Sequence, residues 1–559
     1  MKMLFRLIVF LSLFGVLFLI STRDKQNYVL GSWRSTLWVD PAGYNVYLPA
    51  TFQHSFIHNF PDKMDTIVAY GFMLDKDQKV ITKFTYGVAL LQSPFYISGL
   101  LISKAFGIEN TGYSYFNQVL IDITGIFYAC LALILLFTVL NRRFSKAISF
   151  FTTSIIFLGT NTLYYATIQP GMSHIYSFFL VTLSIYLLSN FFERPTLFRF
   201  CLLSFSISLI VLIRPLNILI VPVLLLFYVD SYAEVLERFR LLFKFKYIFT
   251  FVLIFFFVFL PQFIYWKFAY GRYISDSYPG EGFIFLSHPK IKEFLFSPNN
   301  GLFTYSPLYL LLLLLLFNYF KKFRFMTVAY CLAFVTLIYL SSSWHVFHFG
   351  CGFSARNFVE YSCLLAFPLA HTFSEYRSVI KRGFMSIIIS ILVIINLKLM
   401  YEWDICFFGS NDWSWKEYNY LLYKPNKKIF FNFDSVPNQK IVTFENEKVY
   451  LIDTLDLYSK GIEFHNSTAR SYFKNANITL DLYSLDSLSN AQLACMGTLH
   501  DSTVFYNATL INGPKNKWKT FKLNSGLAFS EDRDYLIKVF IMNDHKKRFY
   551  LKNLNITLN

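Results

Sequence analysis

Charged residues are scarce in this 559-residue chain: Asp, Glu, Lys and Arg make up 15%, whereas hydrophobic residues make up 55% and aromatic residues 20%. This apolar load excludes an ordinary soluble domain of this size. Negative charge is the scarcer sign, with 34 Asp and Glu against 51 Lys and Arg. Much of the positive charge stands in short connectors between apolar segments, which indicates membrane topology and contact with anionic lipid rather than nucleic-acid binding.

Metal-binding cysteine patterns and a signal-cleavage site are also missing. The seven Cys show no metal-ligand spacing, and a single sequence cannot pair Cys351, Cys406 and Cys495, the three that we expect outside the apolar segments. The N-terminus begins MKMLFR and continues into an apolar run, but no small-x-small pattern follows. We therefore interpret it as an uncleaved first membrane span with its N-terminus in the cytoplasm.

Long apolar segments dominate what remains. With the N-terminus in the cytoplasm, all the connectors expected on the cytoplasmic side are basic, as the positive-inside rule requires. If the apolar segment 85–108 also crossed the membrane, all these basic connectors would lie on the outer side. We therefore predict that 85–108 is an interfacial or re-entrant helix on the outer side, broken at Pro94. Within 200–229, Arg214-Pro215 favours two short helices over one bent helix. The predicted fold is a polytopic α-helical membrane unit with eleven spans: 4–20, 117–140, 147–166, 174–191, 200–213, 215–229, 247–268, 302–319, 326–342, 358–373 and 384–402.

The character of the sequence changes at about Lys424. Segments such as KIVTFENEKVYLI and STVFYNATLI alternate apolar and polar residues, with Asn, Asp, Gly and Ser between them. Short strands at this spacing predict a small β-sandwich outside the membrane. We therefore divide the chain into a transmembrane unit, 1–423, whose first outer loop covers 21–116, and a β-domain, 424–559.

The first outer loop holds the most informative residues. In WVDPAGYNVYLPATF, Asp40 follows the first span, Pro41 and Gly43 break the chain, and Tyr44, Tyr47, Leu48 and Phe52 then repeat at helical spacing. This pattern predicts a short helix on the membrane surface. A carboxylate at the bilayer edge is costly unless it is solvated or used, so Asp40 is either a helix cap or a functional group.

Five outer segments carry a family resemblance: VDPAGYNVYLPATF, TKFTYGVALLQSPFY, QPGMSHIYSFF, FSPNNGLFTYSPL and FGCGFSARNFVEY, in this order. Together they resemble the bacterial polytopic glycosyltransferases of the GT-C superfamily, which are related to protein O-mannosyltransferases and aminoarabinose transferases. The resemblance covers about residues 1–420. It implies a sugar donor on a polyprenyl phosphate, an active site at the outer membrane surface, and a catalytic carboxylate at Asp40. Some relatives carry a second acidic residue where Pro41 stands, which puts any role for an acidic pair in doubt.

Glycosyl transfer from a phosphate-linked donor requires a base for the acceptor hydroxyl and positive charge for the departing phosphate. Asp40 is our candidate base, and direct attack predicts inversion at the anomeric carbon. The candidate groups for the donor phosphate are Arg356, Lys83, Arg214 and Arg272, each of which has membrane anchoring as its alternative role.

Histidines on the outer side are further candidates for contacts to phosphate or sugar: His174, His345 and His348. Since His345 and His348 are three residues apart and Glu360 is near in sequence, a divalent metal is conceivable, but this spacing is a poor signal and we assign no metal or other cofactor. Tyr44, Tyr47 and Glu281 are candidates for acceptor binding.

These features predict a glycosyltransferase in a bacterial inner membrane, with its active site and β-domain on the periplasmic side. The expected partners are a polyprenyl-phosphate-linked sugar, membrane lipid, and a glycan, lipid or protein acceptor, but no nucleic acid. Two alternatives stay open. A transporter or flippase for lipid-linked sugars predicts charged residues deep inside spans. A non-catalytic scaffold with a glycan-binding β-domain predicts that the outer loops tolerate substitution.

Overall fold

The computed structural model describes residues 2–22, 30, 35–229, 231–275, 280–350, 352–376 and 378–405, and much of 415–558. The described residues in that last part are 415, 418–419, 422, 429–432, 441–453, 456, 458–459, 461–465, 475–485, 491–499, 502–511, 515–527, 536–543 and 546–558. The chain divides into two compact units, Met1–Met400 and Tyr401–Asn559. The predicted boundary at 423 stays a prediction, because most residues between 406 and 428 lie outside the described part.

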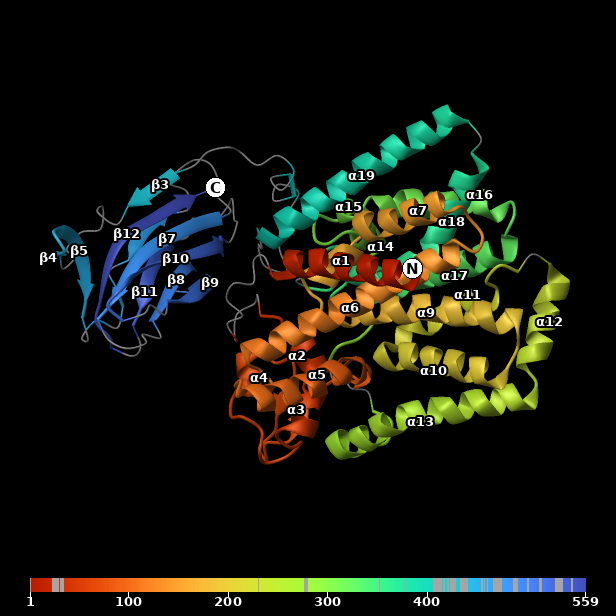
Figure 1. The fold of residues 1–559 in the computed structure, drawn as a ribbon, viewed down its shortest axis with the longest axis horizontal. Coiled ribbons are helices and arrows are strands. Elements are labelled where there is room, and N and C mark those ends of the chain that lie inside the picture. The colour runs from red at the N-terminus through yellow and green to blue at the C-terminus, as the bar shows by residue number, and fades with distance from the viewer. Residues whose placement is uncertain are drawn as a thin grey trace. The chain divides into compact units, whose positions relative to one another are not determined.

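The first unit is a bundle of apolar helices. Its N-terminal half contains α1 (Lys2–Thr22), α6 (Tyr115–Leu140), α9 (Ser173–Glu193), α10 (Leu197–Ile213) and α13 (Phe245–Tyr270). In this half α1 packs on α6, α6 on α9, α9 on α10, and α10 on α13, as Figure 1 shows. Its C-terminal half contains α16 (Leu308–Phe320), α17 (Arg324–Ser343), α18 (Ala366–Glu375) and α19 (Val379–Ile405).

Six helices of the described residues are long and apolar enough to cross a membrane: Gly87–Phe106, Tyr115–Leu140, Ser173–Glu193, Phe245–Tyr270, Arg324–Ser343 and Val379–Trp403. Shorter apolar helices cover Ile8–Thr22, Lys146–Gly159, Leu197–Ile213, Pro215–Leu225 and Leu308–Phe320. All the predicted spans except 358–373 coincide with one of these helices, so the predicted class of polytopic helical protein is confirmed. The number of crossings stays a prediction.

Three of the predicted spans are not single helices. The segment 147–166 is α7 (Lys146–Gly159) followed by a separate α8 (Thr162–Thr167). The segment 302–319 begins with a separate short helix, α15 (Leu302–Tyr305), before α16. The segment 358–373 starts with two 3₁₀ turns, η2 (Arg356–Phe358) and η3 (Ser362–Leu365), before the ten-residue α18. Irregular backbone at membrane depth is tolerated where it is buried in protein or lines a cavity, so these interruptions draw attention to the side chains around them.

The predicted break of 85–108 at Pro94 is wrong. α5 (Gly87–Phe106) is one continuous helix with Pro94 inside it, and it ends at Gly107, whose φ of +65° provides the left-handed C-terminal turn. It is also one of the six helices long enough to span, so its predicted interfacial position stays a prediction. The division within 200–229 is confirmed, because α10 ends at Ile213 and η1 (Pro215–Leu219) leads into α11 (Ile220–Leu225).

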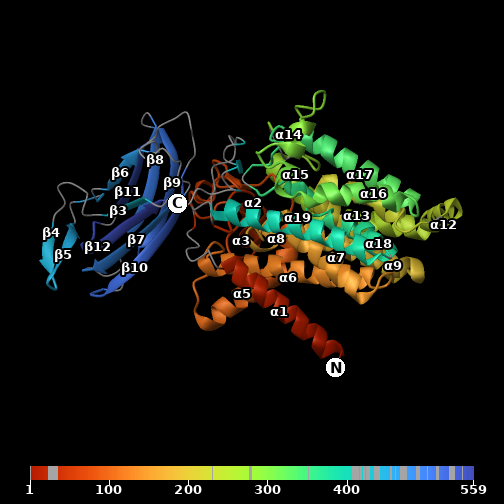
Figure 2. The same ribbon diagram turned by 90° about the horizontal axis from the view of Figure 1, so that it is seen from above.

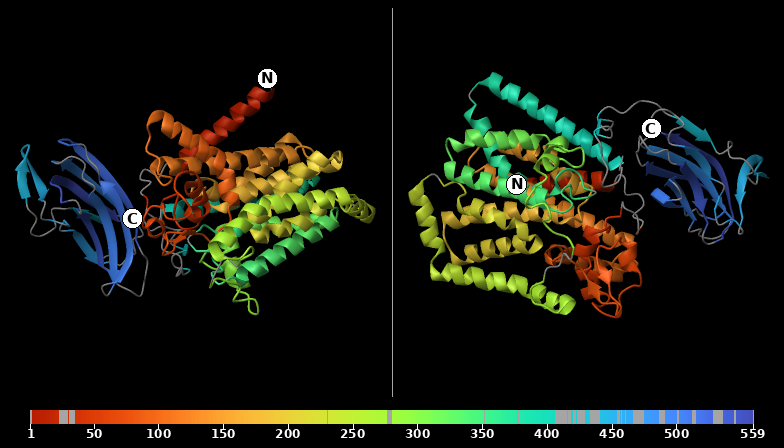
Figure 3. Two further views of the ribbon diagram at one scale, coloured as in Figure 1. Left: turned by 90° about the horizontal axis from the view of Figure 1, so that it is seen from below. Right: turned by 180° about the vertical axis from the view of Figure 1, so that it is seen from behind.

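The first outer loop forms a cluster of short elements at one end of the bundle. It contains α2 (Asp40–Asn45), α3 (Tyr47–Phe52), α4 (Met64–Ile67) and a small hairpin of β1 (Met73–Leu74) and β2 (Val80–Ile81). Figures 1 and 3 show α2–α5 grouped together, while α12 (Tyr232–Leu242), in a connector predicted to be cytoplasmic, lies at the opposite end. The predicted helix after Pro41 is therefore two short helices, and Tyr44, Tyr47 and Leu48 are buried in protein.

The second unit is a β-sandwich, as predicted. Its larger sheet has six strands in the order β10-β7-β12-β5-β4, with β3 also paired to β12, and its smaller sheet has the order β6-β11-β8-β9. Figure 2 shows the two sheets as two layers. The strands are β3 (Ile429–Asn432), β4 (Ile441–Phe444), β5 (Glu447–Ile452), β6 (Ile462–His465), β7 (Asn475–Ser484), β8 (Ala491–Leu499), β9 (Ser502–Ile511), β10 (Trp518–Gly526), β11 (Leu536–Met542) and β12 (Phe549–Leu558).

The inward faces of both sheets share one apolar core. Ile478, Leu480 and Leu482 from the larger sheet meet Leu493 and Val539 from the smaller one. Alternate side chains along a strand point to opposite faces, so the alternating sequence pattern that predicted the domain also places this core. Cys495 is a free, buried member of the core, whereas Cys351 and Cys406 lie outside the described residues.

Candidate functional site

Asp40 is the first residue of α2. The turn that precedes it contains Val39 in a backbone conformation that β-branched residues seldom adopt. Val39, immediately before it, has φ of +52° and ψ of −115°, and a positive φ in a β-branched residue is a genuine outlier. The Val39 N–H donates to the carbonyl of Val68 at 3.0 Å. A Cβ added to Gly71 would lie 2.1 Å from the Val39 carbonyl oxygen. The close approach of these loop segments therefore fixes the turn that presents Asp40, and such strain clusters at functional sites.

Helix α6 anchors the chain that leads into this turn. Gln118 accepts hydrogen bonds from the Ser35 hydroxyl at 2.8 Å and the Thr36 N–H at 3.1 Å. Asp122, a fully buried carboxylate in α6, accepts one from the Thr36 hydroxyl at 3.1 Å. Since these polar groups are buried and hydrogen-bonded, breaking any of them would leave a buried polar group without its partner. The chain that enters the Asp40 turn is thus tied to α6.

Asp40 forms an ion pair with Arg356, a residue from the far end of the helical unit's sequence. Arg356 Nη2 lies 3.0 Å from Asp40 Oδ2, and the two side chains are 22% and 16% exposed. Arg356 opens η2, and its preceding residue is held by Asn161, whose side-chain amide donates to the Ala355 carbonyl at 3.1 Å. Tyr309 OH in turn donates to the Asn161 oxygen at 2.9 Å. The predicted base and one predicted phosphate-binding cation therefore meet at a partly exposed position.

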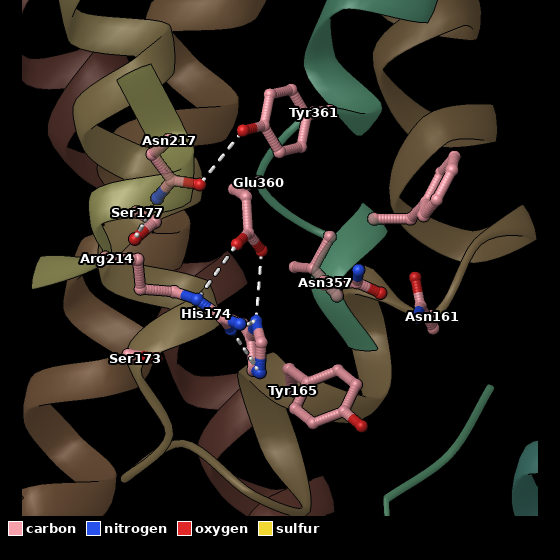
Figure 4. Close-up of polar contacts among 12 residues, drawn as sticks. Asn161, Tyr165, Ser173, His174, Ser177, Arg214, Asn217, Asn357, Glu360 and Tyr361 are labelled. Atoms are coloured by element: carbon pink, nitrogen blue, oxygen red, sulfur yellow. Dashed lines mark hydrogen bonds and ion pairs between the residues drawn. The ribbon is translucent and has the colours of Figure 1, made fainter. Parts of the chain in front are cut away.

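A second group of charged side chains, drawn in Figure 4, is more buried than the first. His174 Nδ1 lies 3.0 Å from Glu360 Oε2, and both side chains are only 1% exposed. Arg214 Nε lies 3.7 Å from Glu360 Oε1, and Arg214 Nη1 lies 3.0 Å from His174 Nε2. Arg214 Nη1 also lies 2.8 Å from His174 Nδ1, and since a guanidinium can only donate hydrogen bonds, His174 must offer it a ring nitrogen without a proton. We call His174, Glu360 and Arg214 the buried triad.

The triad is held by the interruptions of its helices. His174 is in the first turn of α9, Arg214 is the residue between α10 and η1, and Glu360 lies in the turn between η2 and η3. Tyr361 OH donates to Asn217 Oδ1 at 3.1 Å, and the Asn217 amide donates to Ser177 Oγ at 3.2 Å, which ties the three segments together (Figure 4). The start of α9, the predicted break at Arg214 and the unpredicted 3₁₀ turns on either side of Glu360 therefore bring the charges together.

Tyr44 links the Asp40–Arg356 pair to the buried triad. It accepts a hydrogen bond from the Ser173 hydroxyl at 3.0 Å, next to His174 in the chain. Burial raises the pKa of Tyr44, the negative charge of Asp40 raises it further, and Arg214 and Arg356 act in the opposite direction. Both arginines and Asp40 are thus close enough to Tyr44 for their charges to act on its phenol. Tyr165, whose ring lies 5.1 Å from the His174 ring, lines the same region (Figure 4).

Lys83 lies near Tyr44 and forms an ion pair with Glu281. The two side chains form an ion pair and are 32% and 29% exposed. The Lys83 ammonium lies 5.5 Å from the centre of the Phe84 ring, and the Phe84 ring is 4.3 Å from that of Tyr44. Thus two predicted phosphate-binding cations, Lys83 and Arg356, each contact a predicted functional carboxylate.

Other predicted site residues lie elsewhere in the described structure. Arg272 is exposed just beyond the end of α13. The His345 backbone N–H donates to the Gly282 carbonyl at 2.9 Å and so joins its loop to the one before α14 (Ile291–Phe296). His348 accepts at Nδ1 from the Gly350 N–H at 3.2 Å, within its own loop. Tyr47 is buried and donates to the Phe84 carbonyl at 2.7 Å. Within the described residues, no group of three or more His, Cys, Asp or Glu side chains is arranged to hold a metal ion, and no cofactor enters the chemistry below.

Glu360 is a site residue whose partners the sequence does not predict. Its place in the sequence suggests only a metal site with His345 and His348, whereas the structure places it against His174 and Arg214. One feature of the sequence does point to Glu360: it is an ionisable residue inside the predicted span 358–373. An ionisable residue within a membrane span marks a functional position by default. The triad itself could not be read from the sequence, because its members come from three separate helix ends.

No protein-family model matches the chain, and no curated protein matches it. Among solved structures, the chain is similar to the oligosaccharyltransferase of Archaeoglobus fulgidus in its apo form, with 13% identity and a TM-score of 0.40 over 75% of this chain and 58% of that one. It is likewise similar to the oligosaccharyltransferase AglB of the same organism in complex with an inhibitory peptide and a dolichol-phosphate, with 12% identity and a TM-score of 0.40 over 73% and 57%. The chain thus matches less than two thirds of the length of either structure.

Proposed function

We propose that the chain is an integral membrane glycosyltransferase of the GT-C type, which moves a sugar from a polyprenyl-phosphate donor to an acceptor hydroxyl. The observation that supports this most is the 3.0 Å ion pair between Asp40 and Arg356. The sequence predicted these two residues, from separate outer loops, to act as base and phosphate ligand in one reaction. Their side chains meet at a partly exposed position, as that reaction requires.

In this proposal Asp40 removes the proton of the acceptor hydroxyl as its oxygen attacks the anomeric carbon. A base must come within about 2.6–3.2 Å of the hydroxyl oxygen, and a carboxylate on a fixed helix start is suited to this. The bond from the anomeric carbon to the phosphate oxygen breaks with its electron pair, so negative charge accumulates on the departing phosphate. Attack from the side opposite that phosphate gives an inverted product.

Arg356 and Arg214 are the proposed ligands of the departing phosphate. Both guanidinium groups are partly exposed, at 22% and 20%, and their planar forks suit phosphate oxygens. Fixed positive groups aimed at developing charge lower the barrier because they need no reorganisation during the reaction. His174 and Glu360 then orient Arg214, while Lys83 provides a third positive group at the edge.

The test of this proposal compares wild type with Asp40→Asn in nanodiscs, with radiolabelled polyprenyl-phosphate sugars as donors and a membrane extract as acceptor. We expect transfer to fall by about 10²- to 10⁴-fold, the usual contribution of a general base. Asp77→Asn, an exposed residue of the same loop, is the matched control and should transfer like wild type. Equal transfer by wild type and a well-folded Asp40→Asn would refute the role of Asp40. A product with retained anomeric configuration would refute direct inversion.

A transporter of lipid-linked sugars is a second candidate, favoured by charged groups buried within the bundle. Asp122 in α6 is fully buried, as are His174 and Glu360. Ionisable groups in spans mark transport pathways as well as active sites. However, Asp122 accepts a hydrogen bond from Thr36 and so supports the first loop. Flipping of a fluorescent polyprenyl-phosphate sugar in liposomes, without any transfer activity, would favour the transporter.

The periplasmic position of the site, the bacterial inner membrane and the cytoplasmic N-terminus belong to the same proposal. They are supported by the basic connectors on the opposite side of each span. Cysteine accessibility provides a direct check: Asp77→Cys should react with a membrane-impermeant maleimide in intact spheroplasts, and Glu237→Cys in the α12 connector should not.

A further inference from the structure

The outward face of the larger β-sheet carries a row of aromatic side chains across three adjacent strands. Tyr483 on β7 is directly opposite Trp518 on β10 and Tyr550 on β12. Its neighbour in the chain, Leu482, points into the core, so Tyr483 and its two partners point outward. All three side chains are half-buried. Each of the three side chains therefore keeps part of its surface exposed to solvent.

The rings form a connected surface. The Tyr483 ring centre is 5.4 Å from that of Trp518 and 6.3 Å from that of Tyr550. Phe444, at the end of β4, packs against all three rings: its ring centre is 4.5 Å from that of Tyr550, 4.9 Å from that of Tyr483 and 6.4 Å from that of Trp518. The planes of Tyr483 and Trp518 are inclined by 58°, and those of Tyr483 and Tyr550 by 35°. We call these four residues the aromatic row.

Hydrogen-bonding groups border the aromatic row. On the next line across the strands, Asp481 accepts from the Thr520 hydroxyl at 2.5 Å and from the Asn553 amide at 2.7 Å. At the Trp518 end, the indole N–H donates to Glu445 at 3.3 Å. These contacts fix the polar groups beside the rings, so little conformational entropy remains to be lost when a ligand binds.

Lys552 completes this border. Its ammonium lies 4.3 Å from the centre of the Trp518 ring and forms an ion pair with Glu447. The carboxylates of Asp481, Glu445 and Glu447 offset the positive charge of this surface. An anionic lipid surface attracts clusters of Lys and Arg without such compensation, so the border fits a neutral polar ligand better than a membrane.

We infer that the aromatic row is a binding site for a neutral glycan chain. A sugar ring presents C–H groups on its faces and hydroxyl groups around its edge. Aromatic rings suit the faces, and a border of carboxylate, amide and hydroxyl groups suits the edge. Because the rings are inclined to one another, the surface matches a twisted single chain better than a flat, crystalline one. The inference rests on the β-unit alone and does not depend on the proposed glycosyltransferase activity.

The test measures binding of soluble hexasaccharides to the full-length protein in nanodiscs by isothermal titration calorimetry. The probes are cellohexaose, chitohexaose and maltohexaose, with empty nanodiscs as the blank. We expect at least one probe to bind, and Trp518→Ala to weaken its binding by about tenfold, the equivalent of one aromatic contact. Tyr506→Ala, a 42% exposed aromatic residue on the smaller sheet, is the matched control and should bind like wild type.

Two further variants keep the outcome decisive. Trp518→Phe retains a ring at the same position and should bind more tightly than Trp518→Ala, which covers the case in which the Ala variant misfolds. Asp40→Asn should bind the hexasaccharide like wild type. Absence of binding by all three probes, or equal binding by Trp518→Ala and wild type, would overturn the inference. Loss of binding in Asp40→Asn would also overturn it, because the glycan would then occupy the Asp40 site.

Discussion

Two charged clusters lie side by side in the helical unit, and they differ in burial and in how they are held. The Asp40–Arg356 pair joins a helix start in the first loop to a 3₁₀ turn, and both side chains are partly exposed. The buried triad joins three interrupted helix ends, and two of its members are almost inaccessible to solvent. In a partly exposed ion pair, either residue can exchange its partner for a ligand at a low cost in free energy. In a buried ion pair, removing either residue is strongly destabilising.

This difference assigns separate tasks to the two clusters. The exposed pair is suited to contact substrate, because its charges can turn from each other to a hydroxyl or a phosphate. The triad is suited to keep Arg214 in place while this happens, because its carboxylate and imidazole cannot leave. Between the two clusters, the Ser173 hydroxyl, next to His174 in the chain, donates a hydrogen bond to Tyr44 OH.

The largest effect on stability is expected from the triad. Glu360→Ala leaves Arg214 and His174 without their carboxylate, and removal of one partner of a buried ion pair costs about 3–5 kcal/mol. Denaturation in detergent micelles, followed by tryptophan fluorescence, measures the free energy of unfolding. Glu109→Ala, an exposed glutamate in a loop, should change it by less than about 0.5 kcal/mol. A loss of less than about 1 kcal/mol in Glu360→Ala would contradict the distinction between the clusters.

A smaller effect, on activity instead of stability, is expected from the exposed pair. Arg356→Ala removes a charge-assisted contact to the phosphate, worth about 1.5–3 kcal/mol, which corresponds to about a 10- to 150-fold loss of kcat/KM for the donor. Its melting temperature should stay close to that of wild type. Arg272→Ala is the matched control, since Arg272 is predicted from the sequence to have the same role but is exposed beyond α13 in the structure. Equal losses of kcat/KM in Arg356→Ala and Arg272→Ala would mean that the ion pair with Asp40 does not contribute to the reaction.

The smallest effect is expected from the Lys83–Glu281 pair, which is more exposed than either cluster. Glu281→Gln should lower the free energy of unfolding by less than about 1 kcal/mol, because water and salt screen the pair. The difference from wild type should shrink further between 50 mM and 500 mM NaCl. A salt-independent loss larger than that of Arg356→Ala would show that this pair, too, belongs to the buried part of the site.

The sequence by itself determined the classes of structure and most of the residues of interest. Runs of apolar residues can satisfy their backbone hydrogen bonds in a membrane only as helices, so composition predicted a polytopic helical unit. Segments that alternate apolar and polar residues after Lys424 can bury one face only as strands, so the β-sandwich was also determined locally. Asp40 and Arg356 could be singled out individually, because charges at the edges of apolar segments are costly unless they have a use.

Only the tertiary structure decided which of these residues meet. It paired Asp40 with Arg356 and Lys83 with Glu281, and it left Arg272 exposed beyond α13. It also placed Glu360 against His174 and Arg214, through 3₁₀ turns between 356 and 365 that a hydropathy pattern does not reveal. The physical reason is that a charged residue next to an apolar segment needs a partner, but the sequence does not show which residue that partner is. The partner's identity is set by how helices distant in the chain pack together.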